Sequence, residues 1–549
     1  MRLVPLHQAI AGSARDQLLV LLLGVAMLLV LACANVGSML LARNVSRRQE
    51  FQIRLALGST RGRLVREALL ESAVLALLGG LAGLLLTSVT TAVVLTLAPA
   101  TLPRLAWASV DARVWLWVLI TTVAVGVLSG LAPALATLKM GASEWIGDAS
   151  RSTTDRQGRR IIAALVAAEV ALATVLVASA GVMARTLVNL RRMDLGFEPA
   201  GLIAIYLRPG WGVAPGGPDM AIYYQELRQR LERLPGVPAV GAAKGLPLTP
   251  FRQMFDVEVT TDATPAGEPP ITATSWIVVP GYFEAMRVPL AAGRYLEPAD
   301  DIGSRDVAIV SRLLAQRLFG AQDPIGRHIV LSSGAPRRAA VVGVVGDVLT
   351  SPGTPAKETI YLTRSNTAAR LSINLAIRVD GEPATILPGI RDEIAAVEPN
   401  VAILDISTMN EALGNSVAYP RFLAFVLNLF GGAGLLLAAI GISGVGSYGA
   451  AERRQEIGVR IAVGADRRSI ITLVVGEGLR LALLGVVIGV SLQVAVTRSL
   501  GSVLYGLSAT TASTAFATCL ILLLVTASAS YVPARRAARI DPSCLLRGE

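Results

Sequence analysis

Lysine and histidine are scarce in this chain of 549 residues. Only three lysines occur, and each follows leucine or alanine: Lys139, Lys244 and Lys357. A phosphate-binding P-loop needs a lysine between a glycine and a serine or threonine, so this sequence contains no P-loop. The only two histidines are His7 and His328, which excludes a zinc-protease motif and argues against a two-histidine metal site.

Cysteine and charge are also in short supply. The three cysteines are Cys33 and Cys519, both in apolar runs, and Cys544 in the basic tail. None lies between residues 190 and 420, so a disulfide framework is excluded there. Only 16% of residues are charged, 53% are hydrophobic and the mean hydropathy is +0.58. A soluble protein of this length needs more polar surface, so the composition predicts a polytopic membrane protein.

Long apolar runs account for most of this hydrophobicity. A membrane-spanning helix needs about 20 apolar residues. Five runs are free of charge, and two contain one or two charged residues. The runs are 17–42, 72–103, 114–138, 161–184, 422–451, 470–497 and 499–534. The sequence therefore predicts seven transmembrane helices, with a long polar segment between the fourth and the fifth.

Arginine is concentrated in one set of connecting segments. Segments 43–67, 139–160 and 452–469 and the tail are rich in arginine, whereas the opposite short loops 99–113 and 499–512 carry little charge. The positive-inside rule places the basic segments in the cytoplasm, and residues 1–16 and 188–420 outside. The first apolar run is too long for the core of a signal peptide, so we expect none at the N-terminus.

The polar segment has the pattern of ordinary soluble protein. Its early part predicts a strand at 202–207, a helix at 219–234 and a strand at 239–244. Its late part repeats this order at 374–379, 383–397 and 401–406. Residues 250–350 between them contain short β-rich runs with glycine and proline turns. Two β-α-β units around an insertion predict a split α+β domain.

An internal repeat links the two membrane blocks. The sequence RRQEFQIRLALG at 47–58 matches RRQEIGVRIAVG at 453–464, with seven identities in twelve positions and an offset of 406. Arg61 and Arg467 correspond at the same offset, as do Glu71 and Glu477. Each copy therefore reads as a span, a basic loop, a span, a short outer loop and a span.

The repeated basic motif predicts an amphipathic helix at the membrane surface. Glu50 can pair with Arg54, and Glu456 can pair with Arg460, because residues four apart share a helix face. Such a helix either docks into a soluble partner or only lies in the interface. Two copies of one detailed pattern favour docking. The candidate contact residues are Arg48, Glu50, Arg54, Gly58 and Arg61 in the first copy, and Arg454, Glu456, Arg460, Gly464 and Arg467 in the second.

These motifs resemble the FtsX-like permease domain, through Ala34-Asn35-Val36, Leu40-Leu41-Ala42-Arg43 and the repeated basic loop. The polar segment resembles the MacB-like periplasmic core domain. The motifs that carry this second likeness are Val279-Pro280-Gly281-Tyr282-Phe283, Gly293-Arg294, Val307-Ala308-Ile309-Val310, Asp323-Pro324-Ile325-Gly326 and Val342-Gly343-Val344-Val345-Gly346-Asp347. The duplicated layout is most similar to the acidobacterial-type duplicated permeases of the MacB/FtsX superfamily.

The resemblance implies a fold, a partner and a location. The fold is membrane α-helical, with two repeated blocks and one extracytoplasmic α+β domain. The implied function is that of an ABC transporter permease in the inner membrane, which couples ATP hydrolysis by a separate MacB- or LolD-like ATPase to movement of the periplasmic domain. The resemblance does not identify the substrate. We also expect a periplasmic or outer-membrane partner, and we expect no binding of nucleic acid. The chain itself would need no cofactor, since the partner binds ATP.

Domain boundaries follow from the same comparison. We expect two permease domains at 17–140 and 421–542, with coupling loops at 43–67 and 452–469, a linker at 141–160, a span at 161–187, a periplasmic core domain at 188–415 and a tail at 543–549. The second repeat with its preceding span and outer domain, at about 160–549, matches the family pattern throughout. The first lacks its opening span and outer domain, and residues 1–16 resemble the remnant of that domain, as after an N-terminal truncation or a late start codon.

Three acidic residues lie at membrane depth: Glu71, Glu169 and Glu477. Charge inside a membrane is costly and marks a functional candidate by default. For Glu71 and Glu477 we favour pairing with neighbouring arginines, and for Glu169 burial against polar groups, with a proton or substrate role as the less favoured reading. Two other functions stay open: a secondary transporter, and a non-transporting regulator of an envelope enzyme.

Overall fold

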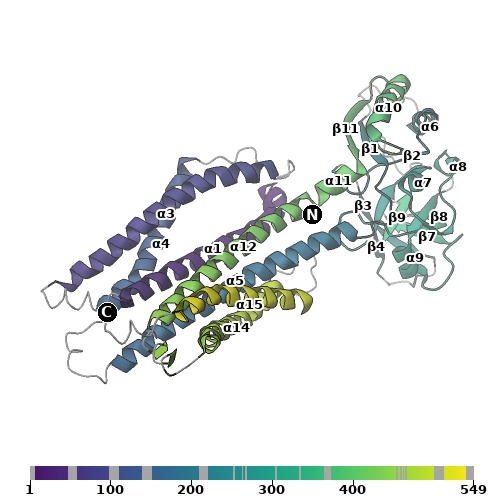
Figure 1. Ribbon diagram of the computed structural model, residues 1–549. Helices are drawn as coiled ribbons and strands as arrows, with labels where there is room; N and C mark the ends of the chain where they lie inside the picture. The colour runs from purple at the N-terminus through teal and green to yellow at the C-terminus, as the bar shows by residue number, and fades with distance from the viewer. Residues whose placement is uncertain are drawn as a thin grey trace. The chain divides into compact units, whose positions relative to one another are not determined.

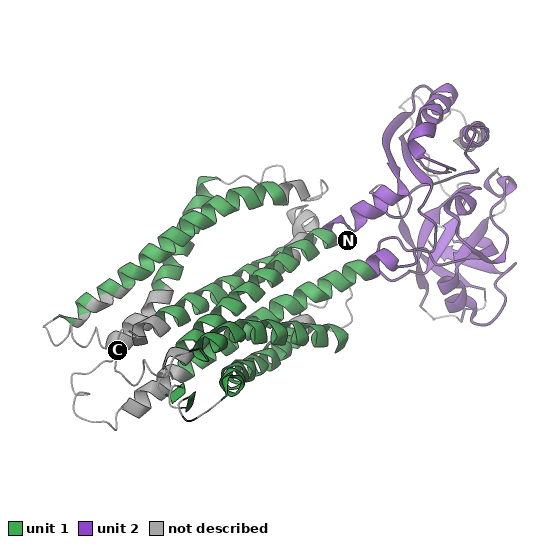
Figure 2. Ribbon diagram, viewed as in Figure 1, with its two compact units in different colours: residues 1–188, 420–549 green, residues 189–419 purple. Residues whose placement is uncertain are grey.

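The computed structural model separates the chain into two compact units (Figure 2). Unit 1 comprises Met1–Val188 and Pro420–Glu549, and unit 2 comprises Asn189–Tyr419. The structure describes residues 6–46, 59–97, 111–138, 151–208, 220–250, 254–262, 264–265, 269–302, 306–332, 336–363, 373–452, 456–457, 460–461, 463, 466–499 and 512–539. Each unit is described below by itself.

Long helices build unit 1 (Figure 1). They are α1 (Leu6–Ser46), α3 (Arg61–Leu97), α4 (Ala112–Leu138), α5 (Arg151–Arg192), α12 (Ala418–Glu452), α14 (Arg467–Ser499) and α15 (Ala512–Ala537). Six of the expected spans are long and apolar enough to cross a membrane. The third expected span lies in α4, whose apolar stretch Ala112–Val127 is shorter, so the total of seven stays a prediction.

Several helix ends differ from the ends of the apolar runs. The charge-free run 499–534 is longer than the last helix, because Ser499 ends α14 and α15 begins at Ala512, where the short loop predicted at 499–512 ends. Absence of charge marks apolar sequence but does not distinguish a helix from its connection. Conversely, α5 begins at Arg151, inside the expected linker, and α1 already begins at Leu6. Arginine is a good helix former that does not need burial, so a helix can extend beyond its apolar run.

Large apolar side chains on the outside of unit 1 fit contact with lipid. Leu85 on α3 is 74% exposed, Phe516 on α15 is 69% exposed and Leu436 on α12 is 68% exposed. Trp115 and Trp117 are exposed near the start of α4, where tryptophan is typical of the membrane interface. Soluble proteins rarely expose so much contiguous apolar surface.

Helix α5 is the most buried of these spans: 67% of its apolar window is buried, against 33% or less for the other five. Glycines on the neighbouring helices allow this close packing. A Cβ atom at Gly485 of α14 would lie 2.6 Å from the carbonyl oxygen of Ala167, and one at Gly489 would lie 2.6 Å from that of Ala171. On α12, a Cβ at Gly431 would lie 3.2 Å from the side chain of Ala180. In lipid, such small residues let helix backbones approach and pack.

The repeat is visible in the fold as two equivalent helix triplets, α1-α3-α4 and α12-α14-α15. Helices α3 and α14 begin at the matched residues Arg61 and Arg467. In each triplet the second and third helices pack through a glycine: Gly80 faces Thr122, and Gly478 faces Ser530. The triplets also differ, because Gly79 and Gly83, the counterparts of Gly485 and Gly489, have no described neighbour within 4 Å of a Cβ position.

A four-stranded antiparallel sheet forms one half of unit 2. Its strands are β1 (Leu202–Arg208), β2 (Ala239–Ala243), β10 (Ile373–Arg378) and β11 (Ala402–Thr408), in the order β11-β1-β10-β2. Helices α6 (Met220–Leu231) and α10 (Pro383–Val397) pack on one face through a shared apolar cluster. Since each β-α-β unit has a strand of the other between its two strands, the predicted split α+β arrangement is confirmed.

Side chains of β1 alternate between two apolar clusters. Ile203 and Ile205 belong to the cluster with α6 and α10, whereas Leu202 and Ala204 belong to a second cluster. This period of two follows from the pleat of a strand. Because both faces are covered, the strand reads as an unbroken apolar run.

The insertion between the two β-α-β units forms a closed sheet. Its strands are β3 (Phe255–Thr261), β4 (Ile271–Ile277), β5 (Leu290–Gly293), β6 (Val307–Ser311), β7 (His328–Ser332), β8 (Arg337–Val345) and β9 (Thr359–Leu362). The order is β5-β8-β6-β9-β4-β3-β7, and β7 also pairs with β8. This last pairing closes a six-stranded ring, which leaves β5 as the remaining edge strand and removes most unpaired backbone groups. Its interior holds Val257, Val310, Ile329 and Val341.

Short helices complete unit 2: α7 (Tyr282–Met286), α8 (Pro298–Ile302), α9 (Arg312–Phe319) and α11 (Met409–Ser416). Helix α7 carries the aromatic centre of the cluster between the two sheets. The ring of Phe283 meets those of Tyr282 and Tyr361 edge to face, with centroids 5.2 Å and 5.0 Å apart. The left-handed Gly281 (φ 93°) precedes α7, and a Cβ there would overlap the carbonyl oxygen of Val240.

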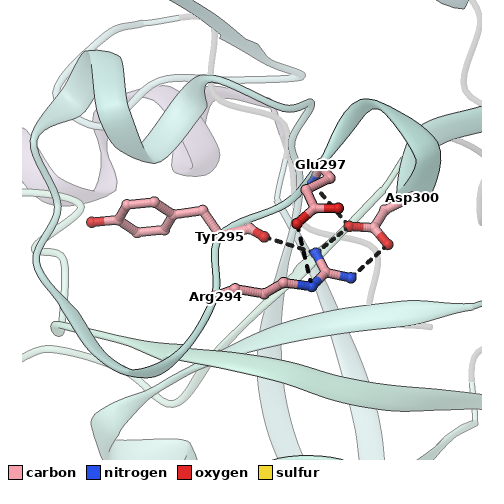
Figure 3. Close-up of polar contacts among 4 residues, drawn as sticks. All are labelled: Arg294, Tyr295, Glu297 and Asp300. Carbon is pink, nitrogen blue, oxygen red and sulfur yellow. Dashed lines mark hydrogen bonds and ion pairs between the residues drawn. The ribbon is translucent and has the colours of Figure 1, made fainter.

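An arginine–aspartate pair closes the turn after β5 (Figure 3). Arg294 Nη1 and Nη2 donate to the two carboxylate oxygens of Asp300 at 2.6 and 3.0 Å. The same Nη1 donates to the carbonyl oxygen of Tyr295, and the backbone N–H of Glu297 donates to Asp300. This hydrogen bonding, chiefly from Arg294, holds the pKa of Asp300 below its ordinary value.

We expect Gly241→Ala to destabilise unit 2 by about 1–3 kcal/mol, as overpacking of a tight site does. Gly241 of β2 lies against the backbone of Tyr282, and its Cβ would be 2.6 Å from the carbonyl oxygen of Gly281. Backbone atoms on both sides cannot shift cheaply. Urea denaturation of the segment 189–419 measures the change.

Gly389→Ala is the matched control, because this glycine lies inside α10 with its nearest neighbour, Leu234, at an ordinary 3.6 Å. Alanine there should stabilise the fold by about 0.5–1 kcal/mol through its higher helix propensity. Equal destabilisation by both substitutions would contradict the close approach at Gly241.

The pair at Asp300 also predicts a dependence on pH. Since the pKa of Asp300 is lowered in the folded state, its contribution to stability is present above the unfolded pKa of about 3.9 and is lost as pH falls through the folded pKa. Arg294 is 42% exposed, so this contribution is at most about 1 kcal/mol. Asp300→Asn should therefore flatten the fall in melting temperature between about pH 5 and about pH 3. An unchanged profile would contradict the assignment.

Candidate functional site

The second basic loop presents one charged and one apolar side. Arg460 Nη2 donates to Glu456 Oε1 at 2.7 Å, and the two side chains are 49% and 54% exposed. This is the predicted pair, four residues apart on a helical turn. Val463, further along the loop, is 84% exposed.

The apolar side of this loop anchors it to the ends of two spans. Ile457 is 3% exposed and belongs to a small cluster with Ile470 of α14 and with Ala537 and Ala538 at the end of α15. Burial of one isoleucine contributes about 1.5–3 kcal/mol, whereas an exposed i,i+4 ion pair contributes about 0.3–0.5 kcal/mol. Packing of Ile457 therefore holds the loop in place. The exposed charged pair contributes little to this anchoring, so its side chains are available to contact a partner.

The remaining candidate loop residues are only partly visible. Arg467 is exposed and begins α14, and its repeat partner Arg61 begins α3. The others lie outside the described residues: Arg48, Glu50, Arg54, Gly58, Arg454 and Gly464. The structure therefore brings Glu456 and Arg460 together in the second copy and leaves the first copy a prediction.

Two of the three intramembrane acids occupy equivalent places in the repeats. Glu71 lies on α3 and is half-buried, and Glu477 lies on α14 and is exposed. Both are near the arginine-rich start of their helices, where charge is tolerated at lower cost than at mid-membrane.

Glu169 differs from both, because it is completely buried in α5. Its carboxylate lies against Gly441 of α12, close enough that a Cβ atom at Gly441 would overlap Oε2. Asn35 of α1 reaches the same point, with Oδ1 3.4 Å from that Cβ position. Three helices from both repeats thus meet at one polar cluster.

The sequence reading singled out Glu169 but not the residues that surround it. Asn35 lies in the motif Ala34-Asn35-Val36, and it is matched with Gly441 by the repeat offset of 406, but neither signal placed it beside Glu169. The role of Ile457 was also missed. From sequence alone, an isoleucine in an amphipathic loop is expected to face the membrane interface, and its packing neighbours are not known. Among the described residues no group of three His, Cys, Asp or Glu side chains is placed to hold a metal ion.

The motifs of the polar segment serve the fold. Tyr282 and Phe283 are core residues, and Arg294 closes a turn. Gly293 has φ 75° and faces the carbonyl oxygen of Val342, and Gly343 lies against the backbone of Arg294. These residues pack strands and turns together rather than lining a reactive site.

Comparison with protein families covers most of the chain. The FtsX-like permease C-terminal family matches residues 22–142 and again residues 428–542. The MacB-like periplasmic core domain matches residues 163–397. The double match corresponds to the two helix triplets, and the second family includes unit 2 as far as α10.

Similar curated proteins are larger exporters. The pyoverdine export ATP-binding/permease protein PvdT of Pseudomonas syringae pv. tomato is 30% identical over 278 residues, which are 48% of this chain and 40% of that protein. The macrolide export ATP-binding/permease protein MacB of Azoarcus sp. is 26% identical over 290 residues, 50% of this chain and 42% of that protein. The chain spans about two fifths of the length of these relatives.

Among solved structures, the periplasmic region of MacB from Actinobacillus actinomycetemcomitans is 16% identical, with a TM-score of 0.28, and covers 41% of this chain and 95% of that one. The extracellular domain of the noncanonic ABC-type transporter YknZ from Gram-positive bacteria is also 16% identical, with a TM-score of 0.25, and covers 37% and 100%.

The spans, the α+β unit and both family matches agree on an inner-membrane, multi-pass protein with a periplasmic domain. The chain belongs to the MacB/FtsX-like permeases of ABC transporters, with two FtsX-like permease domains and one MacB-like periplasmic core domain.

Proposed function

We propose that this permease couples ATP hydrolysis by a separate cytoplasmic ATPase to movement of its periplasmic domain, for export or mechanotransmission. The observation that carries the proposal is the loop around Glu456 and Arg460. Its apolar side is packed on the membrane unit, and its charged side is exposed. An exposed, rigidly held charged pair beneath the spans suits a protein partner better than lipid.

A path for the movement starts at this loop. Ile457 packs on Ile470 near the start of α14, so a push on the loop acts directly on that helix. Helix α14 in turn packs on α5 through Gly485 and Gly489. Helix α5 continues without interruption to Arg192, into the stretch of chain that belongs to unit 2. Contiguous packed elements of this kind are what mechanical coupling requires.

The chain acts as a permease component in this proposal, not as an ATPase. The sequence offers no Gly-Lys-Ser/Thr element to hold phosphates, so the partner would bind ATP and the permease would need no cofactor of its own. The export proteins with which the chain aligns carry "ATP-binding/permease" in their names, which supports an ATPase as the partner.

The double substitution Glu456→Ala with Arg460→Ala should release the ATPase. Removal of a charged contact at the centre of an interface lowers affinity by roughly tenfold or more. The measurement is the ATP hydrolysis that remains with the affinity-purified permease, together with the amount of ATPase subunit retained.

Glu226→Ala with Arg230→Ala is the matched control, because this pair in α6 has the same i,i+4 spacing at 2.9 Å and similar exposure, 51% and 39%. Both exposed pairs contribute little to stability, so a difference between the variants reports docking. Full retention of the ATPase by the Glu456/Arg460 variant would contradict the proposed role of the loop.

The orientation is testable by labelling. In a background without native cysteines, Val463→Cys should react with a membrane-impermeant maleimide in inverted vesicles but not in intact spheroplasts. Leu404→Cys in unit 2, where the native side chain is 47% exposed, should show the reverse. Labelling of Val463→Cys from outside would rule out contact with a cytoplasmic ATPase.

A further inference from the structure

The polar cluster inside unit 1 contains a carboxylate with no partner among the described residues. Neither Oε1 nor Oε2 of Glu169 has a hydrogen-bond partner there, and the side chain is 0% exposed. The apolar cluster of these helices includes Val166 and Val170, within one turn of Glu169 on α5, and Ala438 and Ile442, within one turn of Gly441 on α12. A bare carboxylate in such a place would carry a large desolvation cost.

The neighbouring amide has a defined orientation. Asn35 is 4% exposed, and its Nδ2 donates to the backbone carbonyl oxygen of Leu437 at 2.8 Å. This bond from α1 to α12 assigns the nitrogen end of the amide, so the oxygen end is the one that faces away from Leu437. Among the described residues, Asn35 Oδ1 has no donor.

Gly441 brings these oxygens together. A Cβ atom built on Gly441 would overlap Glu169 Oε2 and would lie 3.4 Å from Asn35 Oδ1, so both oxygens border the same missing side chain. Any larger residue at this position would fill the space that they share. Gly441 is the repeat counterpart of Asn35, so the cluster is built where equivalent positions of α1 and α12 meet.

The atoms of Glu169 and Asn35 that have no partner among the described residues are all oxygens that can accept a hydrogen bond. An ionised Glu169 would place its negative charge next to the negative end of the Asn35 amide dipole. One proton on Glu169 turns an acceptor into a donor and satisfies Asn35 Oδ1 at the same time. A metal cation is a poorer fit, because Ca²⁺ or Mg²⁺ takes about six or more oxygen ligands and the surrounding cluster is hydrocarbon.

We propose that Glu169, Asn35 and the space at Gly441 form a proton-binding site in the membrane, in which the Glu169 carboxyl group donates a hydrogen bond to Asn35 Oδ1. This goes beyond the coupling of an ATPase, because it assigns a bound proton to the contact between the two repeats. Helix α1 comes from the first repeat and α12 from the second, and α5 is the span that precedes the periplasmic segment in the chain. Loss of the proton would replace this bond with repulsion between two acceptors.

Other ionisable groups occur on the helices around the site. Cys33 precedes Asn35 on α1 and is half-buried, and Arg160 and Arg185 lie toward the ends of α5. Others are Arg191 and Arg192 on α5, Tyr419, Arg421 and Tyr448 on α12, Arg467, Arg468, Glu477, Arg480 and Arg498 on α14, and Cys519, Tyr531, Arg535 and Arg536 on α15. None of them donates to Glu169 within the described part of the chain.

Infrared spectroscopy of the full-length protein in lipid tests the proposal. A carboxylic acid has a carbonyl stretch well separated from the bands of a carboxylate, and glutamate labelled with ¹³C at the side-chain carboxyl group identifies it. At neutral pH we expect a protonated carboxyl band that is absent in Glu169→Gln. Glu477→Gln is the matched control on α14 and should leave this band unchanged.

A second variant tests the partner. Asn35→Leu removes the acceptor, so the Glu169 band should shift to the higher frequency of a carboxylic acid without a hydrogen bond. This shift is measurable even if Glu169→Gln fails to fold. Two results would overturn the site: a wild-type spectrum with no protonated carboxyl band at neutral pH, or a band whose frequency is the same in Asn35→Leu. Loss of ATPase retention in the loop variants would leave these spectra unaffected, so the two proposals fail separately.

Discussion

Close packing of helix backbones around α5 is the constraint on which unit 1 depends. In lipid there is no hydrophobic drive between helices, since the acyl chains are as apolar as leucine, so contact area and small residues decide which helices associate. Gly431 on α12 and Gly485 and Gly489 on α14 let both helices approach α5, and a Cβ atom at either of the α14 glycines would lie 2.6 Å from a carbonyl oxygen of α5. A larger residue at any of these three positions would separate the spans that carry the basic loop from the span that continues into the periplasmic segment.

This packing also explains why a polar cluster is tolerated inside the membrane. The same approach of α12 that Gly431 permits leaves room at Gly441 for the side chains of Glu169 and Asn35. Polar residues at this depth are expensive and are retained where they join helices or carry charge. The cluster therefore lies where the permease combines its two repeats, and the loop around Ile457 is the place at which we propose that it receives force. Both features involve the α12-α14-α15 triplet.

Unit 2 follows a different principle, because it is packed by water exclusion. Helices α6 and α10 cover one face of its split sheet, and the closed sheet of the insertion covers the other. Strands β1 and β10 are therefore buried on both sides. The aromatic residues of α7 fill the space between the two sheets. Glycines at positive φ and the pair of Arg294 with Asp300 form the turns, which is why the motifs of this unit are structural.

Local patterns in the sequence were sufficient for the features that depend on neighbours along the chain. These include six of the spans, the two β-α-β units and the pairing of Glu456 with Arg460, because hydropathy, periodicity and i,i+4 spacing act within a few turns. The closed sheet, the anchoring of Ile457 and the meeting of Asn35, Glu169 and Gly441 depend on residues far apart in sequence, and only the tertiary structure decided them. The clearest case is the pair of repeated glycine motifs. Gly79 and Gly83 match Gly485 and Gly489 in sequence, yet among the described residues only the second pair has a helix, α5, packed against it. Which helix packs on a glycine depends on the tertiary arrangement and not on the local sequence.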